Sequence, residues 1–563
     1  MSATTNARPE TNAERIKREK DGLQVWADIL RYAQTGFASI TPDDQDRFKW
    51  YGLYTQRPAE EGFFMLRVKV PGGALSAEQL ETIGWLSQVH ARSTGDITTR
   101  QAIQLHYVRI EDVPHIIGEL EKVGLTTNEA CGDVVRNVVG CPLAGLDADE
   151  VFDASPLIAA ITEKFIHNPA YSNLPRKFKI SLTGCRHHCA QHEINDIGLI
   201  ATRNAAGEHG FDLWVGGGLG ARPFLAKNLG VFVAYDEALE VITRIVEIFR
   251  DSGYRADRKR ARLKFLLADW GVEKFRTELE SKLGRQLADS FPGNDFLLDN
   301  QSASDPHAAL RDHTGVNPQR QSGLFAVGAA TLRGRFSGEQ MVHVAGLARR
   351  YGSGRVRLTN SQNLLLPDVA AADVATMQAE LRAVDLQSDA SAFRRGTVAC
   401  TGRQFCKLAN VETKDRAAEI ITHLEHALPD WQSPLRVSVT GCTNACAQYQ
   451  VAEIGLVGVK GQVNGVEQDF FQIHLGGHLG NGTALGRKLN QRVHVDDAKD
   501  YLERLLRVYR SERLVGERFY EFIARHDAAQ LEAVAARAQQ LQAFNSESNS
   551  EGNPEGKTEG AHA

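Results

Sequence analysis

The sequence predicts an α/β (α+β) fold in which the chain is internally duplicated, with blocks in the order A-B-A′-B′. Three pairs of matching segments support the first half of this prediction. At a common offset of 261, the pairs are residues 76–79 (SAEQ) with 337–340 (SGEQ), 97–105 with 358–366, and 119–125 with 380–386. A shared offset without a gap over about fifty residues indicates an internal repeat.

The second block repeats after the first. Gly184 and Cys185 match Gly441 and Cys442 at an offset of 257, and VGGGLG at 215–220 matches LGGHLG at 475–480 at an offset of 260. Both halves therefore place block A before block B.

Block A is predicted to be a small strand-helix-strand-helix unit. Its β-rich run FFMLRVKV (63–70) precedes a helical pattern at 76–93, a strand AIQLHYVRI (102–110) and a second helix at 111–124. The change from alternating to helical periodicity marks each boundary.

Block B is predicted to be a mixed α/β layer with cysteines in its loops. Short apolar strands, KFKISL (177–182) and FDLWVGG (211–217), alternate with longer helices such as residues 235–253. This alternation is typical of helices packed on a sheet.

Composition and repeats together divide the chain into seven segments. They are an N-terminal extension (1–50), a first A half-domain (51–127), a first B domain (128–290), a polar connector (291–320), a second A half-domain (321–390), a second B domain (391–543) and a polar tail (544–563). The tail has almost no apolar residues, and we expect it to be disordered.

The composition is that of a globular protein that acts away from membranes. Hydrophobic residues make up 42% of the 563 residues and charged residues 24%, and the net charge of −5 argues against general attraction to nucleic acid. No apolar run approaches a membrane span, and the N-terminus lacks the pattern of a secretion or transit signal. We expect a cytoplasmic monomer with no membrane or nucleic-acid partner.

Four of the eight cysteines form a metal-binding pattern in the second half. Cys400 and Cys406 are separated by five residues, and Cys442 and Cys446 by three. Four thiolates fit a [4Fe–4S] cluster, which needs one cysteine for each iron. Zinc sites more often use two short knuckles, which the wider spacing fits poorly, and unligated buried cysteines are the other alternative.

The first half has an incomplete version of this pattern, in Cys141, Cys185 and Cys189. Sequence alignment places Val135 opposite Cys400 and Cys141 opposite Cys406. Three thiolates could bind a metal with His187 or His188 assisting, but a four-cysteine cluster is not available. We favour a structural role for this block.

The cysteine segments CTGRQFC and TGCTNACAQ, in a chain with A-B-A′-B′ order, resemble those of the sirohaem-containing assimilatory nitrite and sulfite reductases, over roughly residues 45–540. The resemblance implies ferredoxin-like A blocks and mixed-sheet B blocks around a central sirohaem and [4Fe–4S] site. It also implies that Cys446 bridges the cluster to the sirohaem iron, and that electrons pass singly from cluster to sirohaem to substrate.

The same resemblance assigns basic residues to the substrate and the sirohaem. Around the substrate it places Arg67, Arg136, Lys177 and Lys179, which could polarise an N–O or S–O bond and help deliver protons. For the sirohaem carboxylates it indicates Arg100, Arg176, Lys264 and Gln362. For Lys264, the basic run RADRKRARLKF (255–265) offers the alternative of docking an acidic protein.

A glycine-rich segment superficially matches a dinucleotide fingerprint. Gly216, Gly218 and Ala221 follow a predicted strand, and Asp236 lies twenty residues after Gly216. The matching segment in the second half keeps the turn but not the spacing. We interpret both as tight glycine turns near the prosthetic group.

The substrate is predicted to be nitrite, with sulfite as the alternative. CTGRQFC and RNVVGCPLAG resemble the ferredoxin-dependent nitrite enzymes, whereas Lys179 is typical of sulfite reductases. No flavin domain or convincing nicotinamide site is recognisable, so the family's usual donor, reduced ferredoxin, is expected to supply electrons. A non-catalytic iron–sulfur electron carrier is the remaining alternative, but it would not explain the four substrate-side cations.

Overall fold

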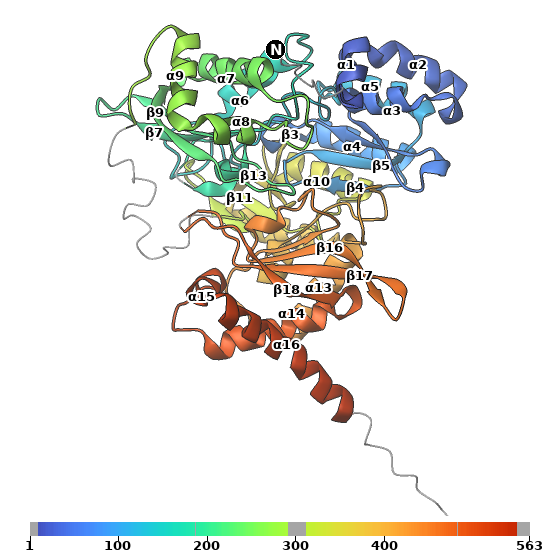
Figure 1. Cartoon of the computed structure of the whole chain (residues 1–563), viewed down its shortest axis with the longest axis vertical. Coiled ribbons are helices and arrows are strands. Elements are labelled where there is room, and N and C mark those ends of the chain that lie inside the picture. Colours follow the sequence, from blue (N-terminus) through green and yellow to red (C-terminus); the bar gives the residue numbers. More distant parts are fainter. Residues whose placement is uncertain (1–9, 186, 291–310, 481, 549–563) are drawn as a thin grey trace, which may run out of the picture.

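The computed structural model describes residues 10–548, apart from residue 186, residues 291–310 and residue 481 (Figure 1). The first α/β domain lies at the upper left, the first small sheet with its helices beside it at the upper right, and the second α/β domain at the bottom of the view. Three N-terminal helices pack at one corner: α1 (Asn12–Glu19), α2 (Trp26–Thr35) and α3 (Pro42–Arg47). None of the described helices has the length and apolar character needed to cross a membrane.

The first half-domain has the predicted strand-helix-strand-helix core. Its sheet has the order β1 (Leu53–Thr55), β2 (Phe64–Val68), β5 (Ile103–Val108) and β4 (Gly95–Ile97), and its helices are α4 (Ala77–His90) and α5 (Val113–Lys122). Helix α4 begins where the sequence predicts because Ser76 and Gln79 form a reciprocal capping box.

The second half-domain repeats this design. Its sheet has the order β10 (Gly315–Pro318), β11 (Leu324–Ala329), β13 (Leu364–Ala370), β12 (Arg355–Leu358) and β3 (Ala74–Ser76), with helices α10 (Gly338–Tyr351) and α11 (Val374–Ala383). Ser337 and Gln340 cap α10 as Ser76 and Gln79 cap α4. The repeated ferredoxin-like half-domains are thus confirmed.

The two half-domains exchange an edge. Strand β3 belongs to the first half in sequence but pairs with β12 of the second half. Conversely, Arg335 of the second half forms an isolated bridge with Asp96 on β4 of the first half-domain. Helices α4 and α10 approach closely at Gly84, where an added Cβ would lie 2.8 Å from the carbonyl oxygen of Gly338. One hydrophobic core therefore runs through both half-domains.

The first α/β domain has a mixed sheet, as predicted. Its strands have the order β6 (Ile180–Thr183), β7 (Ile197–Arg203), β8 (His209–Val215) and β9 (Lys227–Ala234), and its helices are α6 (Ser155–Phe165), α7 (Ala238–Ser252), α8 (Leu263–Trp270) and α9 (Val272–Leu283). Only β6 and β7 are parallel. Apolar residues from all four helices complete the core over this sheet.

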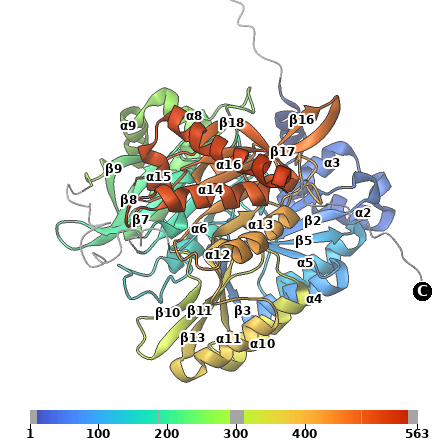
Figure 2. The same ribbon diagram turned by 90° about the horizontal axis from the view of Figure 1, so that it is seen from below.

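The second α/β domain repeats the arrangement with one more strand. The order is β14 (Thr397–Ala399), β15 (Val437–Thr440), β16 (Ile454–Val463), β17 (Val466–Leu475) and β18 (Arg487–His494). Helices α13 (Lys414–Ala427), α14 (Ala498–Glu512), α15 (Phe519–Arg525) and α16 (Ala528–Ser548) cover one face of this sheet (Figure 2). Strands β14, β15 and β16 run parallel, and this part of the sheet carries the cysteine loops.

Three segments differ from or refine the expectation. Residues 315–318 of the expected connector form β10, because their backbone pairs with β11; residues 291–310 lie outside the described part of the chain. The first residues of the expected disordered tail, 544–548, continue α16, and 549–563 are not described. Gly216 has a φ of 78°, and the next regular element is β9, not a helix, so the fingerprint is a glycine turn.

Candidate active site and cluster site

Two neighbouring parallel strands bring the four cluster cysteines together. Cys400 follows β14, with Cys406 in the loop beyond it, and Cys442 and Cys446 lie in the loop after β15. The carboxyl ends of parallel neighbours meet at one edge of a sheet, so sequence-distant loops become adjacent. The register is secured by the Cys400 backbone N–H, which donates to Val439 at 3.1 Å, and Gly441 donates to the Cys400 sulfur at 3.2 Å.

The four thiols share one electrostatic environment. Burial, together with the nearby Cys446 thiol, raises the pKa of Cys400 to about 12. Burial also raises the pKa values of Cys406 and Cys442, and in both the Cys446 thiol adds to the effect. A thiol with a raised pKa keeps its proton in the absence of metal, and a bound metal ion displaces that proton.

Cys446 lies between the other cysteines and the basic residues of the first half. Its carbonyl accepts a hydrogen bond from Thr99 of the first half at 3.0 Å. Its thiol also lies close enough to Arg67 and Lys177 to act on the pKa of each. Cys446 is exposed, whereas the other three cysteines are half-buried.

Arg67 and Arg136 occupy one wall of this region. Arg67, on β2, donates to the Cys131 sulfur at 3.0 Å, and its Nε is buried with no hydrogen-bond partner among the described residues. Arg136 is held by the carbonyl of Gly132, at 2.6 and 2.9 Å. Cys131 was not singled out from the sequence, because it belongs to no spacing pattern.

Lys177 and Lys179 precede β6 and lie in the same region. The backbone N–H of Lys179 donates to Asp196 at 2.8 Å, which fixes the start of the strand. Within the described residues, neither ammonium group has a hydrogen bond or an ion pair. Burial, with help from Arg176 and Arg136, lowers the pKa of Lys177 to about 7. Burial, with Arg100 and Lys177, also lowers the pKa of Lys179 well below its ordinary value.

Arg100 and Arg176 lie near the same region but have protein partners. Arg100 donates to Asn195 and to the carbonyl of Asn137, both at 2.7 Å, while its Nε has no partner among the described residues. Burial lowers the pKa of Arg100 to about 9. Arg176 donates to Asp133 at 3.3 Å.

Lys264 and Gln362 use their polar groups within the protein. The Lys264 ammonium donates to the carbonyls of Gly218, Leu219 and Arg222, at the glycine turn. The Gln362 amide donates to Ile97 at 2.7 Å and accepts from Ala399 at 2.8 Å. In this arrangement Lys264 supports the turn and Gln362 positions the residue before Cys400.

Sequence reasoning missed Arg262. Its guanidinium pairs with Asp196 at 2.8 Å, and its charge contributes to the lowered pKa values of Arg100, Lys177 and Lys179. The signal was present in the basic run 255–265, but nothing in the spacing distinguished Arg262 from Lys264.

The residues fit an anionic prosthetic group and an anionic substrate beside a thiolate-bound cluster. Among the described residues, the ammonium groups of the half-buried Lys177 and Lys179 have no hydrogen-bond partner, and neither do the buried Nε atoms of Arg67 and Arg100. Arg67 and Lys177 lie on the Cys446 side of the cysteine site. Buried charges of one sign are costly unless an opposite charge compensates them.

Comparison with known families agrees with this site. Residues 131–287 and 390–540 match the family described as "Nitrite and sulphite reductase 4Fe-4S domain", and residues 56–123 and 317–384 match "Nitrite/Sulfite reductase ferredoxin-like half domain". The chain belongs to the nitrite and sulfite reductase family. This family uses sirohaem and a [4Fe–4S] cluster, so the reductase is an oxidoreductase with both cofactors.

Known relatives of the reductase have both names. The chain is 41% identical to "Sulfite reductase [ferredoxin]" of Mycobacterium tuberculosis, with 91% of this chain and 94% of the relative covered. It is 38% identical to the "Assimilatory ferredoxin-dependent nitrite reductase" of Haloferax mediterranei, with 91% of each covered. The solved structure of the Mycobacterium tuberculosis NirA protein matches with a TM-score of 0.87 and 40% identity, over 94% of this chain and 99% of that one.

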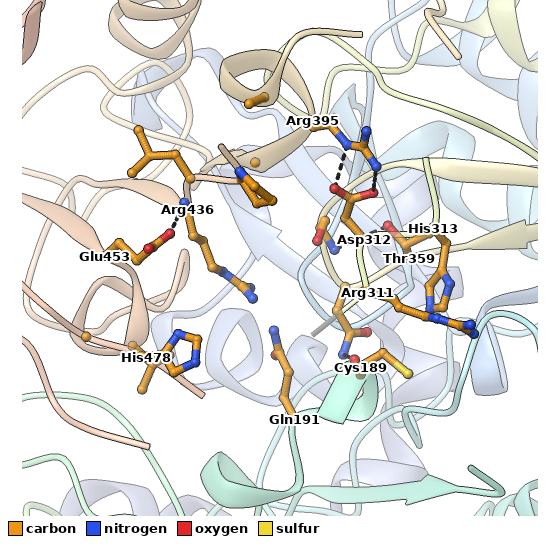
Figure 3. A pocket seen from close by; sticks show the side chains of 18 of the residues that line it. Cys189, Gln191, Arg311, Asp312, His313, Thr359, Arg395, Arg436, Glu453 and His478 are labelled. Atoms are coloured by element: carbon orange, nitrogen blue, oxygen red, sulfur yellow. Dashed lines mark hydrogen bonds and ion pairs between the residues drawn. The ribbon is translucent and has the colours of Figure 1, made fainter. Parts of the chain in front are cut away.

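The duplication relates the cation-rich region of the first half of the reductase to a pocket lined by residues of both halves. At the offset of 257, Arg436 corresponds to Lys179 and Glu453 to Asp196, and the N–H of Arg436 donates to Glu453 at 2.8 Å as that of Lys179 does to Asp196. Arg436 and Cys189 both line this pocket (Figure 3). Cys189 thus occupies the place that Cys446 has beside the catalytic region.

Strand register corrects one sequence alignment. Val139 bridges Ser181 in the first half, and Val398 pairs with the matching Ser438 in the second. Cys141, two residues after Val139, therefore corresponds to Cys400, and the alignment of Val135 with Cys400 was wrong. The physical reason is that strand pairing sets equivalence here, whereas loop lengths between the strands differ.

The lowered pKa of Lys177 predicts the pH dependence of the reductase. We expect kcat/KM for nitrite to fall as pH rises through about 7, because the lysine then loses the charge that attracts the anion. Nitrite keeps its single charge over this range, so the titration belongs to the protein. Lys177→Arg, which stays charged, should flatten the profile; an unchanged profile in that variant would contradict the assignment.

Proposed function

We propose that this reductase takes electrons one at a time from reduced ferredoxin and uses six of them to reduce a small sulfur or nitrogen oxyanion. The observation that carries the proposal is the position of Cys446, between the other cluster cysteines and a group of buried cations from the other half. Electron delivery and anion binding then meet at one residue. A non-catalytic electron carrier would have no use for Lys177 and Lys179, which are half-buried and have no partner among the described residues.

Each set of residues has a proposed task. Cys400, Cys406, Cys442 and Cys446 hold the cluster. Arg100 and Arg176 bind sirohaem carboxylates, while Lys264 and Gln362 support the turn and the cluster loop around it. When bound, the sirohaem supplies the iron centre at which the substrate is reduced. Arg67, Arg136, Lys177 and Lys179 bind the substrate oxygens, and the two lysines hold protons for the oxygens that leave as water.

The cation-rich geometry favours sulfite as substrate. Sulfite carries up to two negative charges near neutral pH and nitrite carries one. Two half-buried lysines with lowered pKa values gain more from a dianion, because it compensates more of their charge. The relatives of the reductase at 41% identity named sulfite reductase are consistent with this preference.

Nitrite is the second candidate, and the segments CTGRQFC and RNVVGCPLAG favour it. Relatives named nitrite reductase share 38% identity, so the sequence interpretation and the cation geometry point in different directions. The expected monomeric state and cytoplasmic location stay predictions.

Ferredoxin is proposed to dock beside Cys406. Lys407 and Leu408 are exposed next to this cysteine, and Leu408 is 59% exposed. The Arg57 guanidinium donates to the Lys407 carbonyl at 3.0 Å and lies close enough to Cys406 to lower its pKa against the effect of burial. Two cations around an exposed apolar side chain suit a small acidic partner.

Turnover with reduced ferredoxin tests the proposal. We expect sulfide from sulfite and ammonia from nitrite, with kcat/KM for ferredoxin falling about tenfold as ionic strength rises to ~0.3 M. Lys407→Glu should raise the KM for ferredoxin, whereas Lys282→Glu, on α9 of the other α/β domain, should not. Salt-independent turnover would contradict the docking surface, and absence of both products would contradict the activity.

A further inference from the structure

Three cysteines that the proposed reaction does not use lie together in the first α/β domain. The sulfurs of Cys141 and Cys189 are 3.6 Å apart, and both thiols lie within hydrogen-bonding reach of Cys185. The hydroxyl of Thr183 lies 3.1 Å from the Cys185 sulfur.

A histidine from the second half lies against two of these cysteines, Cys141 and Cys189, with Cys185 beside them. His313 lies just before β10, and its ring and the sulfurs of Cys141 and Cys189 place their ligand atoms within 4.8 Å of one another. Its side chain is buried, and neither ring nitrogen has a hydrogen-bond partner in the described part of the chain.

Simple packing explains the cysteines but not the histidine. Free cysteine packs well among small and branched apolar residues. The apolar residues around these thiols are Leu143, Ala144, Leu146, Ala326 and Leu365. An imidazole with unpaired buried nitrogens, however, has lost its hydrogen bonds to water without replacing them. A bound metal would provide the missing partner.

We propose that Cys141, Cys185, Cys189 and His313 bind one Zn²⁺ ion in a tetrahedral site. Two sulfurs bound to the same zinc at about 2.3 Å lie about 3.8 Å apart, close to the separation of the Cys141 and Cys189 sulfurs. In an iron–sulfur cubane each cysteine binds a different iron, which needs wider spacing. Thiolate and imidazole ligands suit zinc, which binds such sites more tightly than ferrous iron does.

The proposed zinc site lies at the position in the first half that corresponds to the cluster site of the second half. By strand register and repeat offset, Cys141, Cys185 and Cys189 correspond to Cys400, Cys442 and Cys446. The residue six places after Cys141 is Asp147, so the first half lacks a cysteine equivalent to Cys406. His313 supplies the fourth ligand instead.

The two histidines considered from the sequence have other neighbours. His188 lies 2.6 Å from Glu193, and His187 lies 3.8 Å from Asp149. His313 was not foreseen because it comes from the far end of the connector, more than a hundred residues from the cysteines in sequence. The zinc would therefore link the first α/β domain to the sheet of the second half-domain. Because zinc is redox-inert, it would take no part in electron transfer.

Metal analysis of the holoenzyme tests the proposal independently of its activity. We expect one zinc per chain in addition to cofactor iron, after dialysis against metal-free buffer. X-ray absorption at the zinc edge, which iron does not obscure, should show three sulfurs at about 2.3 Å and one nitrogen at about 2.0–2.1 Å. Absence of zinc, a different ligand set, or a Cys141–Cys189 disulfide found by mass spectrometry would overturn the proposal.

Variants locate the ion. Cys189→Ser and His313→Ala should lower zinc content at least about tenfold, whereas Cys131→Ser, outside the group, should keep it. His313→Cys should retain zinc with four sulfur ligands, which separates loss of a ligand from failure to fold. Full zinc retention in Cys189→Ser would overturn the assignment.

Discussion

Replacing Cys446 by serine is expected to abolish turnover with both sulfite and nitrite. A serine hydroxyl is a far weaker ligand than a thiolate, and Cys446 is the cysteine that lies toward Arg67 and Lys177. We expect kcat with reduced ferredoxin to fall by more than about a thousandfold, equivalent to ~4 kcal/mol in the barrier. Initial rates of sulfide and ammonia formation measure this loss.

The matched control is Thr443→Ser, an exposed position in the same loop. It should leave both rates within a factor of about two. If Cys446→Ser kept more than a few per cent of the wild-type rate, this cysteine could not be the link between cluster and substrate.

Replacing Lys179 by asparagine should change substrate preference. Lys179 is half-buried and its ammonium group has no partner among the described residues, so a bound anion would compensate its charge. Removing one partner of a buried charge pair typically costs about 2–5 kcal/mol. We expect kcat/KM for sulfite to fall about a hundredfold and kcat/KM for nitrite no more than about tenfold. The reason is that the lysine attracts a monoanion less strongly than a dianion, so its removal costs less.

The comparison uses both substrates on wild type, Lys179→Asn and Lys179→Arg. The arginine variant keeps the charge and should retain more sulfite activity than the asparagine variant. Equal losses for the two substrates in Lys179→Asn would contradict a role in selectivity, and a loss confined to nitrite would favour nitrite as the natural substrate.

The repeated elements could be predicted from sequence because their signals are local. Ser76 with Gln79 and Ser337 with Gln340 fix the starts of α4 and α10 within single turns, and short β-rich runs mark β2 and β5. The exchange of β3 could not be predicted, because three residues carry no information about which edge they pair with.

The candidate site divides in the same way. Residue type and spacing were enough to propose the four cluster cysteines, since both pairs lie in short loops. They were not enough to distinguish the lysines with partnerless ammonium groups, Lys177 and Lys179, from Lys264, whose ammonium is used by three backbone carbonyls. That difference depends on what each side chain meets after folding.

By itself, the sequence determined that the chain is duplicated and that its second half has four cysteines at cluster spacing. It also predicted that basic residues of the first half bind the substrate. Tertiary structure alone decided that Cys141 is equivalent to Cys400 and that His313 joins the three remaining cysteines. The physical reason is range: helix caps, strand alternation and ligand spacing act over a few residues. Strand register and the meeting of distant loops are set by the packing of the whole chain.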